Sequence, residues 1–151
     1  MAGETQVEAR LRVLEDIEAL KKLKARYWRY IDNKMWQELA DCFDEEPFAE
    51  YLGPENQFRS VADIVAYLKG DPERFETTAY HHGHNPDIEI TRDDRAKGVW
   101  AFYVNINMSG KRSSSSVTMA GFYEDEYVKR GGAWRIKKTV ARATAMETAN
   151  K

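Results

Sequence analysis

The chain has 151 residues, with 23 basic and 25 acidic side chains and a net charge of −2. This length suits one domain over residues 1–151, and the balanced charge argues against nucleic-acid binding. No apolar run approaches the ~20 residues of a membrane helix, and the N-terminal segment lacks the order of a signal peptide. We therefore expect a cytoplasmic protein that binds neither nucleic acid nor membrane. Cys42 is the only cysteine, which excludes an intrachain disulfide.

The first third of the chain has a helical pattern. From Glu4 onward, apolar residues recur at steps of three and four with charged residues between them, which predicts a long helix packed on a sheet. These residues are Val7, Leu11, Leu14, Ile17, Leu20, Leu23 and Tyr27. Asp32 and Asn33 favour a break. A second, shorter helix is expected over residues 35–43.

The rest of the chain changes from helical to strand character. A strand is expected around residues 48–52, and a third helix follows Ser60, which forms a pattern similar to a capping box with Asp63 and ends at Gly70. Long strand patterns joined by tight turns then cover residues 77–91, 99–108, 117–129 and 134–146. The order predicts an α+β fold. In it, a strongly curved antiparallel sheet is covered on one face by the three helices and encloses a pocket.

All three histidines lie in one strand-like stretch. Side chains alternate along a strand, so His82 and His84 share one face and His81 points to the other. A zinc site would need a third ligand with suitable spacing, so we expect no metal, and His81 and His82 are interpreted as surface residues. Gly83 indicates a close approach or bulge, which favours an inward-facing His84. Asp32, near the end of the long helix, could orient that imidazole for proton transfer.

Other side chains could line the pocket. The hydroxyl of Tyr27 needs a partner if buried, and could donate to a substrate oxygen. Trp100, Phe102 and Val104 alternate on one strand face and could form an apolar wall. Arg142, near the end of the last strand, could contact a substrate anion or carbonyl if it faces inward, or be a solvated strand-end charge.

These motifs resemble a known family. The segment from residue 16 through Tyr27, Asp32 and Leu39, the 83–86 stretch with His84, and the closing 132–136 stretch are similar to the SnoaL-like domain of the NTF2-like superfamily. Within that superfamily the chain resembles bile acid 7α-dehydratases and, more loosely, scytalone dehydratases and hexachlorocyclohexane dehydrochlorinases. The resemblance implies an NTF2-like cone, no cofactor and a homotrimer. It also implies three roles: His84 as general base, Asp32 as its orienting carboxylate, and Tyr27 as the substrate-oxygen contact. Val104 departs from the pattern, because it stands where the bile acid enzymes have a second acidic residue.

Together, the residues and the resemblance predict a cofactor-free lyase. It would eliminate water from a hydrophobic alicyclic or aromatic substrate activated by a carbonyl group. A ketosteroid-type isomerase or a polyketide cyclase would use the same fold. A non-catalytic ligand-binding or assembly domain remains the alternative from another class, since one fold hosts many functions.

Overall fold

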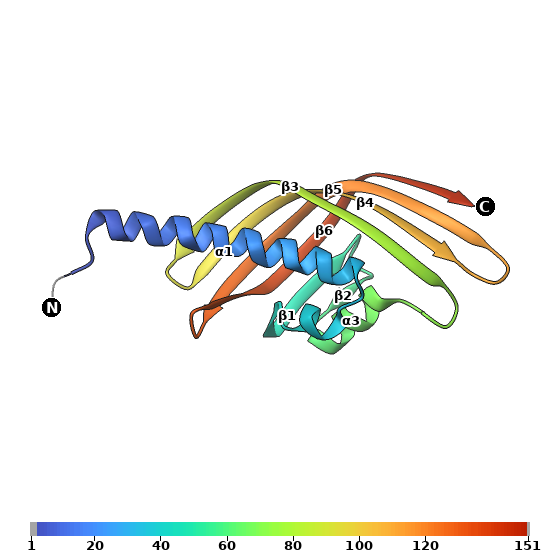
Figure 1. Ribbon diagram of the computed structural model, residues 1–151, viewed down its shortest axis with the longest axis horizontal. Helices are drawn as coiled ribbons and strands as arrows, with labels where there is room; N and C mark the ends of the chain where they lie inside the picture. The colour runs from blue at the N-terminus through green and yellow to red at the C-terminus, as the bar shows by residue number, and fades with distance from the viewer. Residues whose placement is uncertain (1–2, 151) are drawn as a thin grey trace.

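The computed structural model describes residues 3–150. It contains three helices and six strands, and the predicted α+β class is confirmed (Figure 1). In chain order the elements are α1 (Gln6–Asp32), α2 (Trp36–Ala40), β1 (Phe43–Tyr51), β2 (Gln57–Phe58), α3 (Val61–Lys69), β3 (Glu76–Arg92), β4 (Arg95–Ser109), β5 (Ser114–Arg130) and β6 (Ala133–Asn150). None of the helices within residues 3–150 is long and apolar enough to cross a membrane.

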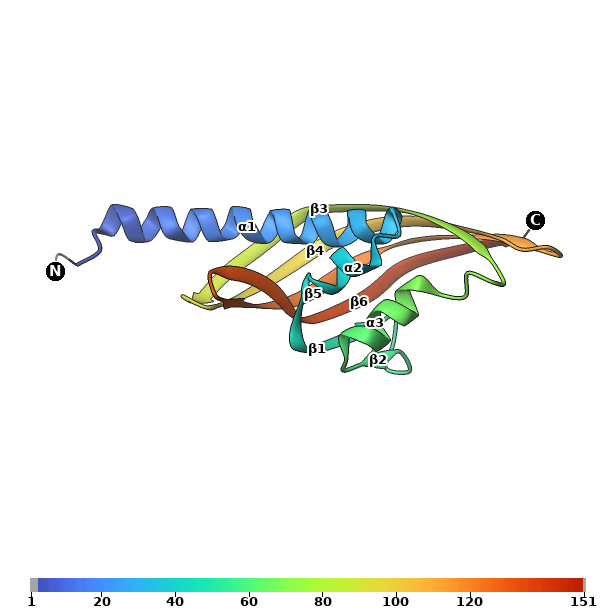
Figure 2. The ribbon, with the colours of Figure 1, turned by 60° about the horizontal axis from the view of Figure 1, so that its bottom comes forward.

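The strands form a single sheet in the order β2-β1-β6-β5-β4-β3. β3 to β6 are antiparallel neighbours joined by tight turns, whereas β1 lies parallel to β6. The parallel pair differs from the wholly antiparallel sheet that we expected. β1 and β6 are separated by most of the chain, so no hairpin forces them to run in opposite directions. The sheet curves beneath α1, with α2 and α3 beside the same face (Figures 1 and 2).

Helix α1 has two different halves. Leu20, Leu23 and Tyr27 are buried against the sheet, but Val7, Leu11 and Leu14 are 72%, 52% and 61% exposed. The single stripe predicted over this helix is therefore wrong. An α-helix turns about 100° per residue, so each three-residue step falls about 60° short of a full turn. The three such steps from Leu14 to Leu23 therefore rotate the apolar side by about 180°. The first turns of the helix also extend past the sheet (Figures 1 and 2).

Aromatic rings fill the core between α1 and the sheet. Trp28 meets Trp100 and Tyr123 edge to face, at centroid distances of 5.5 Å and 5.6 Å, and Phe102 meets Tyr123 at 5.0 Å. Such edge-to-face pairs add to the stabilisation from burial. This packing holds the C-terminal half of α1 at a defined height above β3 and β4.

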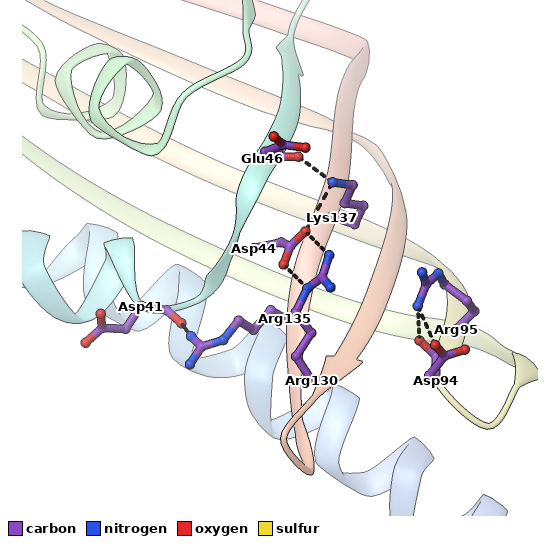
Figure 3. Close-up of polar contacts among 8 residues, drawn as sticks. All are labelled: Asp41, Asp44, Glu46, Asp94, Arg95, Arg130, Arg135 and Lys137. Atoms are coloured by element: carbon purple, nitrogen blue, oxygen red, sulfur yellow. Dashed lines mark hydrogen bonds and ion pairs between the residues drawn. The ribbon is translucent and has the colours of Figure 1, made fainter.

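Ion pairs tie β1 to β6 and to the end of β5. The buried carboxylate of Asp44 accepts hydrogen bonds from Arg130 Nε at 2.6 Å and Lys137 Nζ at 3.1 Å (Figure 3). The hydrogen bonds of Arg130 hold the pKa of the Asp44 carboxyl at about 2, below its usual range. Arg135 donates to the carbonyl of Asp41 nearby. These contacts fix the parallel strand pair that closes the core.

Candidate functional site

The end of α1 and the middle of β3 meet at Asp32 and His81. Nδ1 of His81 lies 2.6 Å from Oδ1 of Asp32, and the backbone N–H of His81 donates to Oδ2 at 2.9 Å. The side chains of His81 and Asp32 are 9% and 16% exposed. Both carboxylate oxygens of Asp32 therefore bond to His81, which fixes the position of the imidazole ring.

This arrangement sets the chemistry of the imidazole. An ionised carboxylate can only accept hydrogen bonds, so Nδ1 of His81 carries a proton and donates to Asp32. In the neutral imidazole, Nε2 is then left with its lone pair. A histidine oriented in this way by a carboxylate can act as a general base and return the proton later as a general acid.

Local structure explains why the two residues meet. Asp32 is the last residue of α1. The side-chain amide of Asn33 donates to the Arg29 carbonyl at 2.9 Å, and Lys34, with a φ of 57°, turns the chain away from the helix axis. β3 is one of the two edge strands, so one row of its backbone groups has no neighbouring strand. The Asp32 carboxylate satisfies the N–H of His81 in that row.

The predicted pairing of Asp32 with His84 needs correction. His84 is exposed, and no side-chain hydrogen bond or ion pair to it occurs within the part of the chain that the structure describes. Gly83 does mark a close approach, because a Cβ built there would lie 1.8 Å from the Trp28 ring. That approach places Gly83 on the face toward α1. Since side chains alternate along a strand, His81 shares this face and His84 points away, so interpreting His81 as a surface residue was also wrong.

The Asp32–His81 pair borders an open groove of about 560 Å³ between α1 and β3. Aromatic rings of Trp28 and Trp100 contribute apolar wall, and Arg29 is the one arginine or lysine among its lining residues. The remaining lining residues are Ala25, Asn33, Ala79, Tyr80, His82 and Gly83. A hollow of this size, with apolar walls and a few polar groups, is typical of a small-molecule site.

Of the residues predicted for the pocket wall, only Trp100 lines this groove. Phe102 and Val104 are buried in the core. Arg142 is largely exposed and pairs with Glu50 at 3.1 Å, so its inward-facing placement is corrected: it is a solvent-facing charge in the middle of β6 and not at a strand end. It lies opposite Phe122, whose exposed ring marks the outer side of the sheet.

Tyr27 lies deeper than we expected. Its hydroxyl is 2.9 Å from the hydroxyl of Tyr51, both rings are buried, and neither lines the groove. Burial raises the pKa of the Tyr27 hydroxyl well above its usual value. Tyr27 therefore stays a neutral phenol whose hydrogen-bonding partner comes from within the protein.

A buried ion pair that our reading of the sequence missed lies between α1 and β5. Lys24 Nζ lies 2.7 Å from Oδ2 of Asp125, with both side chains fully buried. The ammonium also lies 3.9 Å from the centroid of the Tyr123 ring, and burial lowers the pKa of Lys24. Asp125 further accepts hydrogen bonds from Tyr127 and Thr139 at 2.7 Å and 2.6 Å. Lys24 lies four residues before Trp28, so the two side chains share the sheet-facing side of the helix. This spacing is the sequence signal that could have predicted a buried Lys24.

Comparison with known proteins identifies the family. The model of the SnoaL-like domain matches residues 12–140. This chain belongs to the SnoaL-like domain family. Among residues 3–150 of this SnoaL-like domain, no three His, Cys, Asp or Glu side chains gather where they could hold a metal ion.

Solved structures share the fold of this SnoaL-like domain. A putative scytalone dehydratase from Novosphingobium aromaticivorans matches with a TM-score of 0.79 and 21% identity, covering 90% of this chain and 89% of that one. The hexachlorocyclohexane dehydrochlorinase LinA-type3 from Novosphingobium barchaimii matches at 0.79 and 18%, covering 93% and 94%. The Kfla4162 protein from Kribbella flavida matches at 0.77 and 17%, covering 89% and 95%. At these identities the matches establish the fold alone, and they confirm the NTF2-like cone.

Proposed function

We propose that the protein is a lyase that eliminates water from a small hydrophobic alicyclic or aromatic compound carrying a carbonyl group. The observation that carries this proposal is the Asp32–His81 pair, whose imidazole borders a groove walled by Trp28 and Trp100. Two solved structures of the same fold carry lyase names, a putative scytalone dehydratase and a dehydrochlorinase. The finer resemblance to bile acid 7α-dehydratases stays a prediction.

The reaction follows from the free Nε2 of His81. This nitrogen removes a proton from the carbon next to the substrate carbonyl, and the electron pair of that C–H bond forms a carbon–carbon double bond as the bond to the β-hydroxyl breaks. The imidazolium, stabilised by Asp32, returns the proton to the departing oxygen on the same face, and water leaves. General acid–base catalysis of this kind contributes about 10²–10⁴-fold, and positioning in the groove supplies further acceleration.

Arg29 is placed to bind the substrate oxygen. It lies one helical turn before Asp32 on α1, so both side chains reach the same groove. No ion pair within residues 3–150 uses its guanidinium. A guanidinium there can donate to the carbonyl as negative charge develops on its oxygen. We assign this role to Arg29 in place of Tyr27 and Arg142.

Replacement of the two groups tests the proposal. His81→Gln and Asp32→Asn are assayed on a panel of cyclic β-hydroxy ketones, with His84→Gln as the matched control on the opposite face of β3. Each site variant should lower kcat/KM by about 10²–10⁴-fold, while the control keeps wild-type turnover. Wild-type turnover in His81→Gln contradicts the proposal.

The product separates the alternative reactions. Mass spectrometry of a dehydration product shows the loss of one water, whereas an isomerase leaves the substrate mass unchanged. A protein that quenches its tryptophan fluorescence on binding the panel compounds but converts none of them would be a ligand-binding domain.

A further inference from the structure

The N-terminal half of α1 carries an apolar stripe that its own chain leaves uncovered. Val7, Leu11 and Leu14 are all more than half exposed, and they follow one another at steps of four and three. Residues spaced in this way form one narrow seam, as in the core positions of a coiled coil. Leu14 and Leu23 point about 180° apart on the helix, so the seam faces away from the sheet that Leu23 packs on.

Two charged residues beside the seam have no ion-pair partner among the residues that the structure describes. Arg10 and Glu15 flank its two sides, and neither takes part in an ion pair among residues 3–150. In a parallel helix pair, a flanking residue on one helix faces the residue five positions later on its partner. Arg10 of one copy would then meet Glu15 of the other, and symmetry would form this pair twice.

The opposite orientation brings like charges together. In an antiparallel pair centred on Leu11, Glu8 would lie against Glu15 of the other copy, which is unfavourable. The charges beside the seam therefore favour parallel over antiparallel pairing. Because the seam faces away from the sheet, the bodies of the two copies would lie on opposite sides of the paired helices and would not collide.

We propose that two copies of this chain associate through α1, in parallel, with Val7, Leu11 and Leu14 of each copy forming the shared core. Glu18 and Lys21, bonded to each other at 2.6 Å, occupy the next two seam positions. These charges end the core after three layers. A seam this short buries less area than the ~1,200 Å² of a standard stable interface, so the association is concentration-dependent.

Sedimentation velocity across a range of protein concentrations tests this interface. The wild type should shift from monomer to dimer as protein concentration rises. Leu11→Glu should raise the midpoint, the concentration at which half of the chains are dimeric, by at least 10-fold. Tyr80→Ser changes a residue that is 64% exposed on β3 and serves as the matched control, with no change expected. The midpoint is a measure of assembly alone, so it is independent of the proposed reaction.

Charge exchange tests the parallel orientation. Glu15→Arg and Arg10→Glu should each weaken association by several-fold, and the Arg10→Glu/Glu15→Arg double variant should restore it. In an antiparallel pair Glu15→Arg would strengthen association instead, because it would remove the repulsion from Glu8. That result would overturn the proposal. A wild type that stays monomeric at all concentrations would also overturn it. So would an assembly that is lost in Tyr80→Ser but kept in Leu11→Glu. Circular dichroism verifies that each variant is folded.

Discussion

Gly83 lies directly beneath the ring of Trp28, so close that a Cβ atom at this position would be 1.8 Å from the ring. The contact joins β3 to α1 two residues from His81 and four from Asp32. A side chain at Gly83 cannot fit unless the Trp28 ring is displaced or the helix and strand move apart, and either change would disturb the contact that positions the two members of the proposed catalytic pair.

Gly83→Ala is therefore expected to lower both stability and activity. Overpacking of this kind costs about 1–3 kcal/mol of unfolding free energy, which urea denaturation measures. His84→Ala, on the outward face of the same strand, should change that free energy by less than about 0.5 kcal/mol. Equal stability of Gly83→Ala and the wild type would show that the approach of Trp28 is not tight.

Arg29→Gln should lower kcat/KM for carbonyl substrates by about 10–100-fold, the worth of one charge-assisted hydrogen bond. Arg29→Lys retains the charge and should recover part of the loss. Arg26→Gln is a suitable control, because Arg26 is exposed on the same helix and lines a different hollow. A loss of equal size in the Arg26 variant would remove the specific role assigned to Arg29.

Lys24→Met should destabilise the fold by about 3–5 kcal/mol, because it leaves the buried carboxylate of Asp125 without its cation. Lys22→Met, at an exposed position of the same helix, should have little effect. Thermal denaturation of both variants provides the comparison. If Lys24→Met unfolds at the wild-type temperature, the ion pair makes no net contribution to the stability of the fold.

The low pKa of Asp44 predicts an acid-dependent loss of stability. Its carboxyl has a pKa of about 2 in the folded protein, against about 3.9 for an unfolded chain, so the stabilisation is complete above pH ~4 and is lost as pH falls toward 2. The side chain is 1% exposed but its partner Arg130 is 55% exposed, so we expect a contribution of about 1–2 kcal/mol after solvent screening.

Asp44→Asn should remove that contribution at neutral pH and flatten the decline in unfolding free energy between pH 4 and 2. Glu46→Gln provides the control, because Lys137 bonds the backbone carbonyl of Glu46 and not its carboxylate (Figure 3). The same acid slope in Asp44→Asn and the wild type would contradict the assignment.

Cys42 should react slowly with thiol reagents. Burial raises the pKa of its thiol to about 11, so the thiolate fraction at pH 8 is about 10²-fold below that of a free cysteine. As the only cysteine, it makes Ellman's reagent a direct readout. Labelling should be slow in buffer and rapid in urea, and rapid labelling of the native protein would show that the site opens.

Sequence patterns were enough to predict features set by neighbouring residues. The Ser60 hydroxyl accepts from the Asp63 N–H at 3.1 Å as the capping pattern indicated, and the alternation along β4 correctly separated buried Trp100 from exposed Tyr103. Helix and strand periods repeat within a few residues, so such patterns reflect local geometry. The α+β class could be predicted for the same reason, whereas the family was recognised from the resemblance of individual motifs.

The candidate site depended on relations that no local pattern contains. The sequence by itself determined that His81 and His84 point to opposite faces of a strand, and it left Gly83 as either a close approach or a bulge. Only the tertiary structure decided which face meets α1, because that choice rests on where Trp28 packs, 55 residues before Gly83 in the chain. Likewise, periodicity placed apolar residues along α1, but the side of the helix on which the sheet packs decided which of them are buried and which remain available to another copy.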